Sequence, residues 1–182
     1  VFYLGNACRG LGLNREAISL YRRFDSLSGS EDDRFAAWYY VGAIYMDMFV
    51  RRPVDAREAY FRCITIKPND PRGYYGLARA DAALKRWGES LQWYHLGTTK
   101  QMPETQVHSC DPTHVNGPSH AIASICAREQ DDFENCLRYA TRAYQARAGF
   151  AQAKELLAQA QGFQAAMLLT NGFGSIFANL TY

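Results

Sequence analysis

The run Trp38-Tyr39-Tyr40-Val41-Gly42-Ala43-Ile44-Tyr45 carries the pattern that decides the fold. Large apolar residues recur in it at three- and four-residue steps, which is typical of a helix with one packed face. A second helical period follows at Ala56, Tyr60 and Cys63 and ends before Pro68. The sequence therefore predicts two helices, joined by a short connection, between residues 38 and 68.

The same two-helix pattern recurs along the chain. The positions equivalent to Val41 are Leu4, Leu77 and Ala123, at separations of 37, 36 and 46 residues. A small residue follows each of these, and we expect a small residue of the second helix to face it: Gly5 with Ala17, Gly42 with Ala56, Ala78 with Ser90, and Ser124 with Cys136. A larger side chain at these positions would push the two helices of a pair apart.

This pattern resembles the tetratricopeptide repeat, whose period is about 34 residues. Its signature positions are occupied in the best repeat by Trp38, Val41, Gly42, Tyr45, Ala56, Tyr60 and Pro68. The third repeat has Asp81 where the family prefers Tyr, and the fourth rests on small residues alone. The resemblance implies an all-α fold: a right-handed helical solenoid of stacked antiparallel helix pairs over residues 1–147, with three clear repeats and one degenerate repeat. The alternative is an unrelated helical bundle.

Two segments follow the repeats. An apolar stripe from Phe150 to Ala160 predicts a capping helix over residues 148–171 that stops near Asn171-Gly172. Residues 172–182 form an apolar tail. Such a tail either folds back onto the solenoid or docks on a second copy of the chain. In the second case the contacts would come from Phe173, Ile176, Phe177 and Tyr182.

Composition and charge exclude several classes of protein. With 20 Lys and Arg against 18 Asp and Glu, the chain lacks the basic excess of a protein that grips nucleic acid. It has no apolar run long enough for a membrane span. The segment Val1–Leu4 lacks the basic start of a signal peptide, and the missing initiator Met suggests a piece of a longer protein. Five cysteines at irregular spacing predict buried reduced thiols, and hence a cytoplasmic location.

A loop insertion is expected at residues 98–118, between the third and fourth repeats. It brings together His108, Cys110 and His114, with His120 just beyond, and imidazole and thiolate groups at short spacing can hold zinc. The spacing is not that of a standard zinc finger, so a polar loop rich in turn residues is the alternative. We expect no cofactor.

Catalysis has little support in the sequence. A pair of Cys110 with His108 or His114 has no third group to orient it. There is no glycine-rich phosphate loop and no His-Glu-x-x-His segment. The sequence therefore predicts a protein that is not an enzyme.

The remaining functional surface is the one that the family resemblance implies, a concave groove lined by the first helix of each repeat. The outward-facing residues there are expected to be Phe2, Asn6, Arg9, Tyr39, Met46, Arg72, Tyr75 and Arg79. Tyr and Arg are frequent anchors in protein interfaces, so a protein or peptide partner is predicted. Packing between repeats is the alternative for Tyr39 and Tyr75.

Two further hypotheses concern what carries this module. Residues 4–12, Tyr21-Arg22-Arg23 and Glu31–Phe35 are similar to the repeat region that follows bacterial family 2 glycosyltransferase domains. That resemblance implies an accessory region whose catalytic domain lies upstream. The other hypothesis is a self-assembling structural subunit that docks through its apolar tail.

Overall fold

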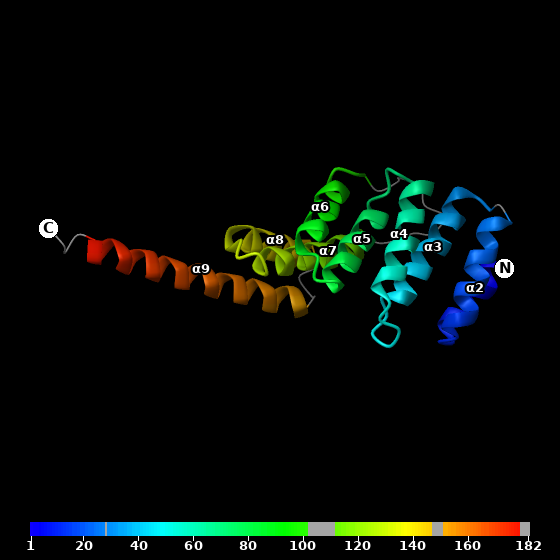
Figure 1. The fold of residues 1–182 in the computed structure, drawn as a ribbon, viewed down its shortest axis with the longest axis horizontal. Helices are drawn as coiled ribbons and strands as arrows, with labels where there is room; N and C mark the ends of the chain where they lie inside the picture. The colour runs from blue at the N-terminus through cyan, green and yellow to red at the C-terminus, as the bar shows by residue number, and fades with distance from the viewer. Residues whose placement is uncertain (28, 102–111, 147–150, 179–182) are drawn as a thin grey trace. The chain divides into compact units, whose positions relative to one another are not determined.

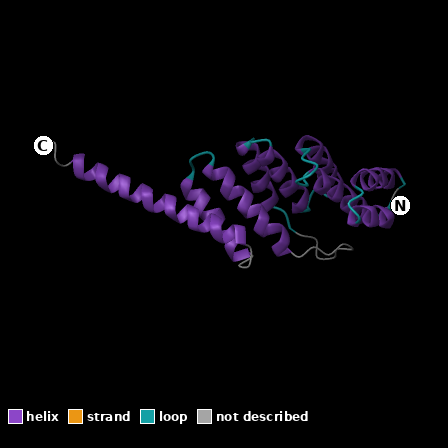
Figure 2. Ribbon diagram, turned by 90° about the horizontal axis from the view of Figure 1, so that it is seen from below, coloured by secondary structure: helices purple, strands orange, loops and turns teal. Residues whose placement is uncertain are grey.

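The computed structural model describes residues 1–27, 29–101, 112–146 and 151–178, and these residues are helical with short connections (Figures 1 and 2). The helices are α1 (Phe2–Gly10), α2 (Asn14–Ser26), α3 (Glu31–Tyr45), α4 (Pro53–Ile66), α5 (Pro71–Ala83), α6 (Trp87–Thr98), α7 (Pro112–Arg128), α8 (Phe133–Ala146) and α9 (Ala151–Ala178). They fall into two compact units, residues 1–115 and residues 116–182. The predicted all-α fold of consecutive helix pairs is confirmed.

In the first unit, α1 to α6 stack in chain order as three antiparallel pairs (Figure 1). Side-chain N-caps fix the first residue of α3 and of α5, the helices that begin the second and third pairs. The Ser30 hydroxyl accepts a hydrogen bond from the Asp33 N–H at 3.2 Å at the start of α3. The Asp70 carboxylate does the same for the Arg72 N–H at 3.0 Å, and Pro71 occupies the first turn of α5. Caps of this kind satisfy backbone groups that a helix end leaves without partners.

The centre of the first unit is the ring of Tyr60 on α4, which is buried. A β-carbon on Gly42 of α3 would lie 2.6 Å from its Cε1 atom, and one on Gly76 of α5 would lie 2.3 Å from its Cδ1 atom. Real β-carbons do not approach other atoms so closely, so both positions require glycine. One tyrosine thus packs against the helix before it and the helix after it.

The small residues predicted to face each other are brought together in two pairs. The Ser90 hydroxyl of α6 donates to the Ala78 carbonyl of α5 at 2.7 Å. The Ser124 hydroxyl of α7 donates to the Cys136 carbonyl of α8 at 2.9 Å. Beside Gly5 and Gly42 the space is instead filled by a tyrosine one turn further along the second helix, Tyr21 and Tyr60 respectively.

In the second unit, α8 packs against α9. Among the described side chains of α9, the buried ones are Ala153, Leu156 and Ala160, three members of the predicted apolar stripe. The Phe133 and Phe163 rings extend this contact, with centroids 5.3 Å apart. None of the described helices has both the length and the apolar character needed to cross a membrane.

Two predicted boundaries are wrong. Helix α7 begins at Pro112, so residues 112–118 are helical rather than part of a loop, and Pro118 lies inside the helix. Helix α9 continues through Asn171-Gly172 to Ala178. Pro112 stands at the start of α7, where proline is well tolerated, and a glycine inside a helix such as Gly172 costs only about 1 kcal/mol, so neither residue ended its helix. Residues 102–111 of the predicted insertion lie outside the described part of the chain.

The contact between Tyr60 and Gly76 predicts the effect of a single methyl group. Gly76→Ala should lower the free energy of unfolding by about 1–3 kcal/mol, because the added carbon overlaps a buried ring that has no room to move. Urea unfolding followed by circular dichroism measures this. Gly10→Ala is the matched control, since nothing lies within 4 Å of its β-carbon position. Equal stability of Gly76→Ala and the parent would contradict the packing described.

Candidate ligand groove

Four of the predicted groove residues lie at the surface of the first helices of the three pairs, and a fifth, Met46, directly follows α3. Arg9 and Arg79 are exposed, whereas Asn6, Tyr39 and Met46 are half-buried. Helices α3 and α5 contact each other directly, and the Arg9 guanidinium links α1 to α3 because it lies 4.3 Å from the centre of the Tyr40 ring. We call Asn6, Arg9, Tyr39, Met46 and Arg79 the inner helix face.

Buried tyrosines lie next to the two exposed arginines of this face. The Tyr21 hydroxyl donates to the Asn6 side-chain oxygen at 2.7 Å. Burial raises the pKa of Tyr21, and the Arg9 charge partly opposes that rise. Burial also raises the pKa of Tyr60, against the charge of Arg79. Both phenols therefore stay protonated at neutral pH, and the positive charges of the face remain uncompensated by them.

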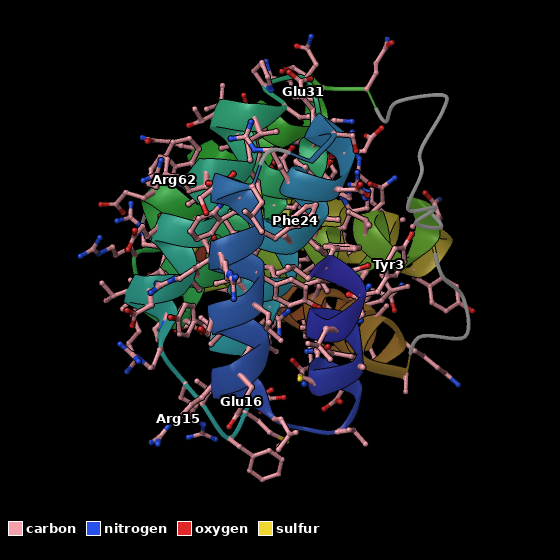
Figure 3. The ribbon with its side chains drawn as sticks, turned by 90° about the vertical axis from the view of Figure 1, so that its right-hand side faces the viewer. Tyr3, Arg15, Glu16, Phe24, Glu31 and Arg62 are labelled. Atoms are coloured by element: carbon pink, nitrogen blue, oxygen red, sulfur yellow. The ribbon has the colours of Figure 1, made fainter. Side chains whose placement is uncertain are left out.

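The prediction that Phe2 lines a groove is wrong. Its side chain is only 4 % exposed and packs in the core, with ring centroids 5.9 Å from Tyr21 and 5.4 Å from Phe24. The next residue, Tyr3, points outward and is 79 % exposed (Figure 3). One residue turns a helix by about 100°, so a shift of one position exchanges an inward side chain for an outward one.

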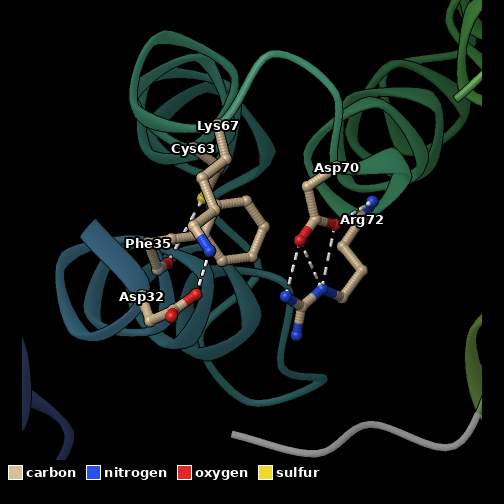
Figure 4. Close-up of polar contacts among 6 residues, drawn as sticks. All are labelled: Asp32, Phe35, Cys63, Lys67, Asp70 and Arg72. Atoms are coloured by element: carbon tan, nitrogen blue, oxygen red, sulfur yellow. Dashed lines mark hydrogen bonds and ion pairs between the residues drawn. The ribbon is translucent and has the colours of Figure 1, made fainter. Parts of the chain in front are cut away.

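Arg72 is likewise an interior residue and not a groove residue (Figure 4). Its Nε atom donates to the Asp70 Oδ1 atom at 3.0 Å, and its Nη2 atom donates to Oδ2 at 2.6 Å. The guanidinium also lies 4.6 Å from the centre of the Phe35 ring. This two-point ion pair, capped by an aromatic ring, joins the start of α5 to α3 and leaves no charge for a ligand.

The prediction that Tyr75 lines a groove is wrong, and it packs inside its own helix pair rather than between repeats as the alternative interpretation held. It is 8 % exposed, and its ring fills the space beside Gly97 of α6. The Tyr94 ring lies 6.1 Å away. Burial, with a smaller contribution from Tyr94, raises the pKa of Tyr75 to about 12. Tyr39 is intermediate, because its ring stacks on Phe35 at 6.2 Å but stays half-exposed.

A buried ion pair was missed by the sequence analysis, although its signal was present. Asp81, which replaces the expected Tyr, is fully buried, and its carboxylate lies 2.8 Å from the Arg57 Nε atom and 3.8 Å from Arg86. A buried carboxylate without a cation would be strongly unfavourable, so the substitution itself required a nearby arginine. The pair links α4 to α5 and serves the fold.

A cavity of about 330 Å³ was also missed, and it adjoins the inner helix face at Met46. It lies between the end of α3, the α3–α4 connection and the end of α5. Its lining consists of Tyr45, Met46, Met48, Arg51, Pro53 and Ala83. An apolar wall with one guanidinium suits an apolar side chain next to a carboxylate or a carbonyl oxygen.

The predicted metal ligands are only partly described. His108 and Cys110 lie outside the described residues, as does the side chain of His114. His120 is half-buried on α7, and burial together with the Arg142 charge lowers its pKa to about 4. Among the side chains that the structure describes, no group of three His, Cys, Asp or Glu is placed to hold a metal ion.

The predicted oligomer contacts fall at the end of α9. Phe173, Ile176 and Phe177 belong to this helix, but their side chains are outside the described part, and Tyr182 is outside it altogether. Just before them, residues 161–169 are all exposed. They include Phe163, Met167, Leu168 and Leu169, with exposed fractions of 39, 45, 68 and 63 %.

Comparison with known proteins places the fold in a class. No known family profile matches the sequence, and no curated protein matches it either. Solved structures do match, and those described below are tetratricopeptide-repeat proteins. The chain therefore has the fold of a tetratricopeptide-repeat solenoid.

The similar structures include MamA, at a TM-score of 0.68 and 13 % identity over 98 % of this chain and 97 % of that chain. A structure of MamA from residue 41 to its end, from Desulfovibrio magneticus RS-1, has a TM-score of 0.60 and 17 % identity over 82 % and 75 % of the two chains. The Pseudomonas aeruginosa protein PilF has a TM-score of 0.62 and 14 % identity over 86 % and 64 %. Such identities show a shared fold alone.

His120 predicts a pH dependence of stability. Its pKa is about 4 in the folded chain and near 6.5 when unfolded. Above pH 6.5 both states are neutral; as the pH falls from about 6.5 to about 4, the unfolded chain takes up a proton that folded His120 does not. The free energy of unfolding should therefore fall over this window. In His120→Gln this component should disappear from thermal denaturation curves measured against pH, and an unchanged profile would refute the assignment.

Proposed function

We propose that the chain is a non-catalytic scaffold that binds a peptide segment of a partner protein on the inner helix face. The observation that carries the proposal is the pair of exposed arginines, Arg9 and Arg79, on either side of the half-exposed Tyr39. Arginine and tyrosine are the side chains that most often anchor protein interfaces. The tetratricopeptide-repeat fold of the chain supports the same class of function.

The chemistry of the face favours an extended peptide with acidic and apolar side chains. Arg9 is held over the Tyr40 ring, so its guanidinium is oriented before a ligand arrives and loses little freedom on binding. Arg79 can pair with a carboxylate of the ligand. The cavity beside Met46 can take an apolar side chain of the same ligand. Because Arg72 is already paired with Asp70, it offers no charge to the ligand, and a strongly acidic tail fits less well.

This proposal is tested with peptides selected on the full chain from a displayed random library. Arg79→Gln should weaken the selected peptides about tenfold in a fluorescence titration, because an interface arginine contributes about 1–2 kcal/mol. Arg9→Gln should have a smaller effect of the same sign. Arg23→Gln is the matched control, since Arg23 is an exposed arginine of α2, a second helix. Peptides that bind all four proteins equally would contradict a site on the inner helix face.

A second candidate function, self-assembly, is supported by α9. The first half of this helix packs against α8, whereas Met167, Leu168 and Leu169 are exposed in its second half. Exposed apolar side chains gathered on one helix commonly mark an interface. A second copy of the chain could cover them, in line with the hypothesis of docking through Phe173, Ile176, Phe177 and Tyr182. The hypothesis of a glycosyltransferase-associated region stays a prediction.

Light scattering tests the second candidate. The parent chain should show a mass above that of a monomer, and Leu168→Ser combined with Leu169→Ser should reduce it, because two exposed apolar contacts are lost. Leu96→Ser, at a residue of α6 that is 46 % exposed, should leave the mass unchanged. A chain ending at Asn171 separates the contribution of the tail. A monomeric parent at high concentration would rule out self-assembly.

A further inference from the structure

One edge of the first unit differs from the other in its apolar side chains. Residues 11–13, 46–52 and 84–86 connect the two helices within each pair, and the antiparallel stacking places all three connections on one edge (Figure 1). We call these three connections the turn edge. The α3–α4 connection, drawn in cyan in Figure 1, forms a loop that projects beyond the ends of α3 and α4.

Large apolar residues are exposed at the tips of this edge. Phe49 is 89 % exposed and Met48 67 %, and Leu11 and Leu13 of the α1–α2 connection are 75 % and 45 % exposed. On the opposite edge, the described residues of the connections 27–30, 67–70 and 99–101 include only Leu27 as a large exposed apolar residue. The apolar side chains are thus concentrated on one side of the unit.

Positive charge accompanies them. The turn edge contains the four cations Arg51, Arg52, Lys85 and Arg86 and the single carboxylate of Asp47. That carboxylate is turned toward the loop itself, where it accepts a hydrogen bond from the Phe49 N–H at 2.9 Å. Arg52 is paired with Asp55 in the first turn of α4, and Arg86 lies 3.8 Å from the buried Asp81. The cations that face outward most openly are therefore Arg51 and Lys85, and both are exposed.

The α3–α4 connection holds a defined shape. The Arg51 Nε atom donates to the Met48 carbonyl at 2.9 Å, and the Arg51 N–H donates to the Asp47 carbonyl at 2.9 Å. Arg51 itself has a left-handed backbone, with φ of 47°. These bonds leave the Phe49 ring at the tip, so its exposure is built into the loop. Figure 3 shows Arg15, at the start of α2, toward the same edge and Glu31 at the opposite one.

We propose that the turn edge docks on the surface of an anionic lipid bilayer. Phe49 and Met48 would enter the headgroup region, while Arg51 and Lys85 contact lipid phosphates. A bilayer interface accepts separate apolar tips at different points of an edge, and anionic headgroups attract cations at the same level. A protein partner would need one continuous apolar patch, whereas these side chains stand on two separate connections. Arg9, Tyr39 and Arg79 of the inner helix face lie along the helices and not on the turn edge, whereas the cavity lined by Met46, Met48 and Arg51 adjoins both, so Arg79 reports on peptide binding alone.

Vesicle co-sedimentation of the full chain tests the proposal. The probes are vesicles of phosphatidylcholine alone and of phosphatidylcholine mixed with phosphatidylglycerol. The chain should sediment with the mixed vesicles and not with the neutral ones, and added salt should weaken the binding. Phe49→Ser should weaken it about tenfold through the lost apolar contact. Arg51→Gln should weaken it about fivefold, the share of one cation near an anionic surface.

Two control variants distinguish binding through the turn edge from nonspecific adsorption to vesicles and from binding through the peptide site. Leu27→Ser, at an apolar residue 55 % exposed on the opposite edge, should bind like the parent. Arg79→Gln should also bind vesicles like the parent. The vesicle experiment and the peptide experiment therefore test the two proposals separately. Circular dichroism melts check that each variant is folded. No sedimentation with anionic vesicles, or binding that ignores Phe49 and Arg51, would overturn the proposal and leave the edge to a protein partner.

Discussion

The position of the Tyr60 ring between two glycines is the constraint on which the first unit depends. The ring fills the space that side chains at Gly42 of α3 and Gly76 of α5 would occupy. One side chain of a second helix therefore sets how closely the first helices of two successive pairs approach each other. Because α3 and α5 come into contact in this way, Tyr39, Met46 and Arg79 can belong to one surface. The candidate ligand face is thus a consequence of the packing behind it.

One position of the repeat is contacted by arginines from neighbouring segments in two successive pairs, although the residue there is a tyrosine in one pair and an aspartate in the next. In the second pair this position is Tyr45, whose hydroxyl accepts a hydrogen bond from Arg22 at 3.3 Å and whose ring lies 5.3 Å from the Arg52 guanidinium. In the third pair it is Asp81, which pairs with Arg57 and Arg86. A ring tolerates the loss of an arginine, whereas a buried carboxylate left alone would be destabilising by about 3–5 kcal/mol. The third pair is therefore more sensitive to charge than the second.

The helix pairs could be predicted from the sequence because their signal is local. Leu77, Ala78 and Ser90 recur at the spacing that two packed helices need, and the Ser90 to Ala78 hydrogen bond follows from it.

The candidate site was less predictable. Phe2 is buried because it packs against Tyr21 and Phe24 of another helix. Arg72 forms an ion pair with Asp70, and this pair competes with any ligand. Helix ends at Pro112 and beyond Gly172 escaped prediction because a proline fits the first turn of a helix and a glycine inside a helix costs only about 1 kcal/mol.

The inner helix face and the turn edge are separated by the geometry of the helix pairs. Asn6, Arg9, Tyr39 and Arg79 of the first lie along α1, α3 and α5, while the second lies at helix ends, and Met46, directly after α3, belongs to both. An exposed phenylalanine at a tip contributes nothing to the core and promotes association of the free protein. The loop nevertheless holds Phe49 outward through bonds of its own from Asp47 and Arg51. A connection that only joined α3 to α4 would need neither the apolar tip nor those bonds, so the projecting loop is best explained by a surface that it contacts.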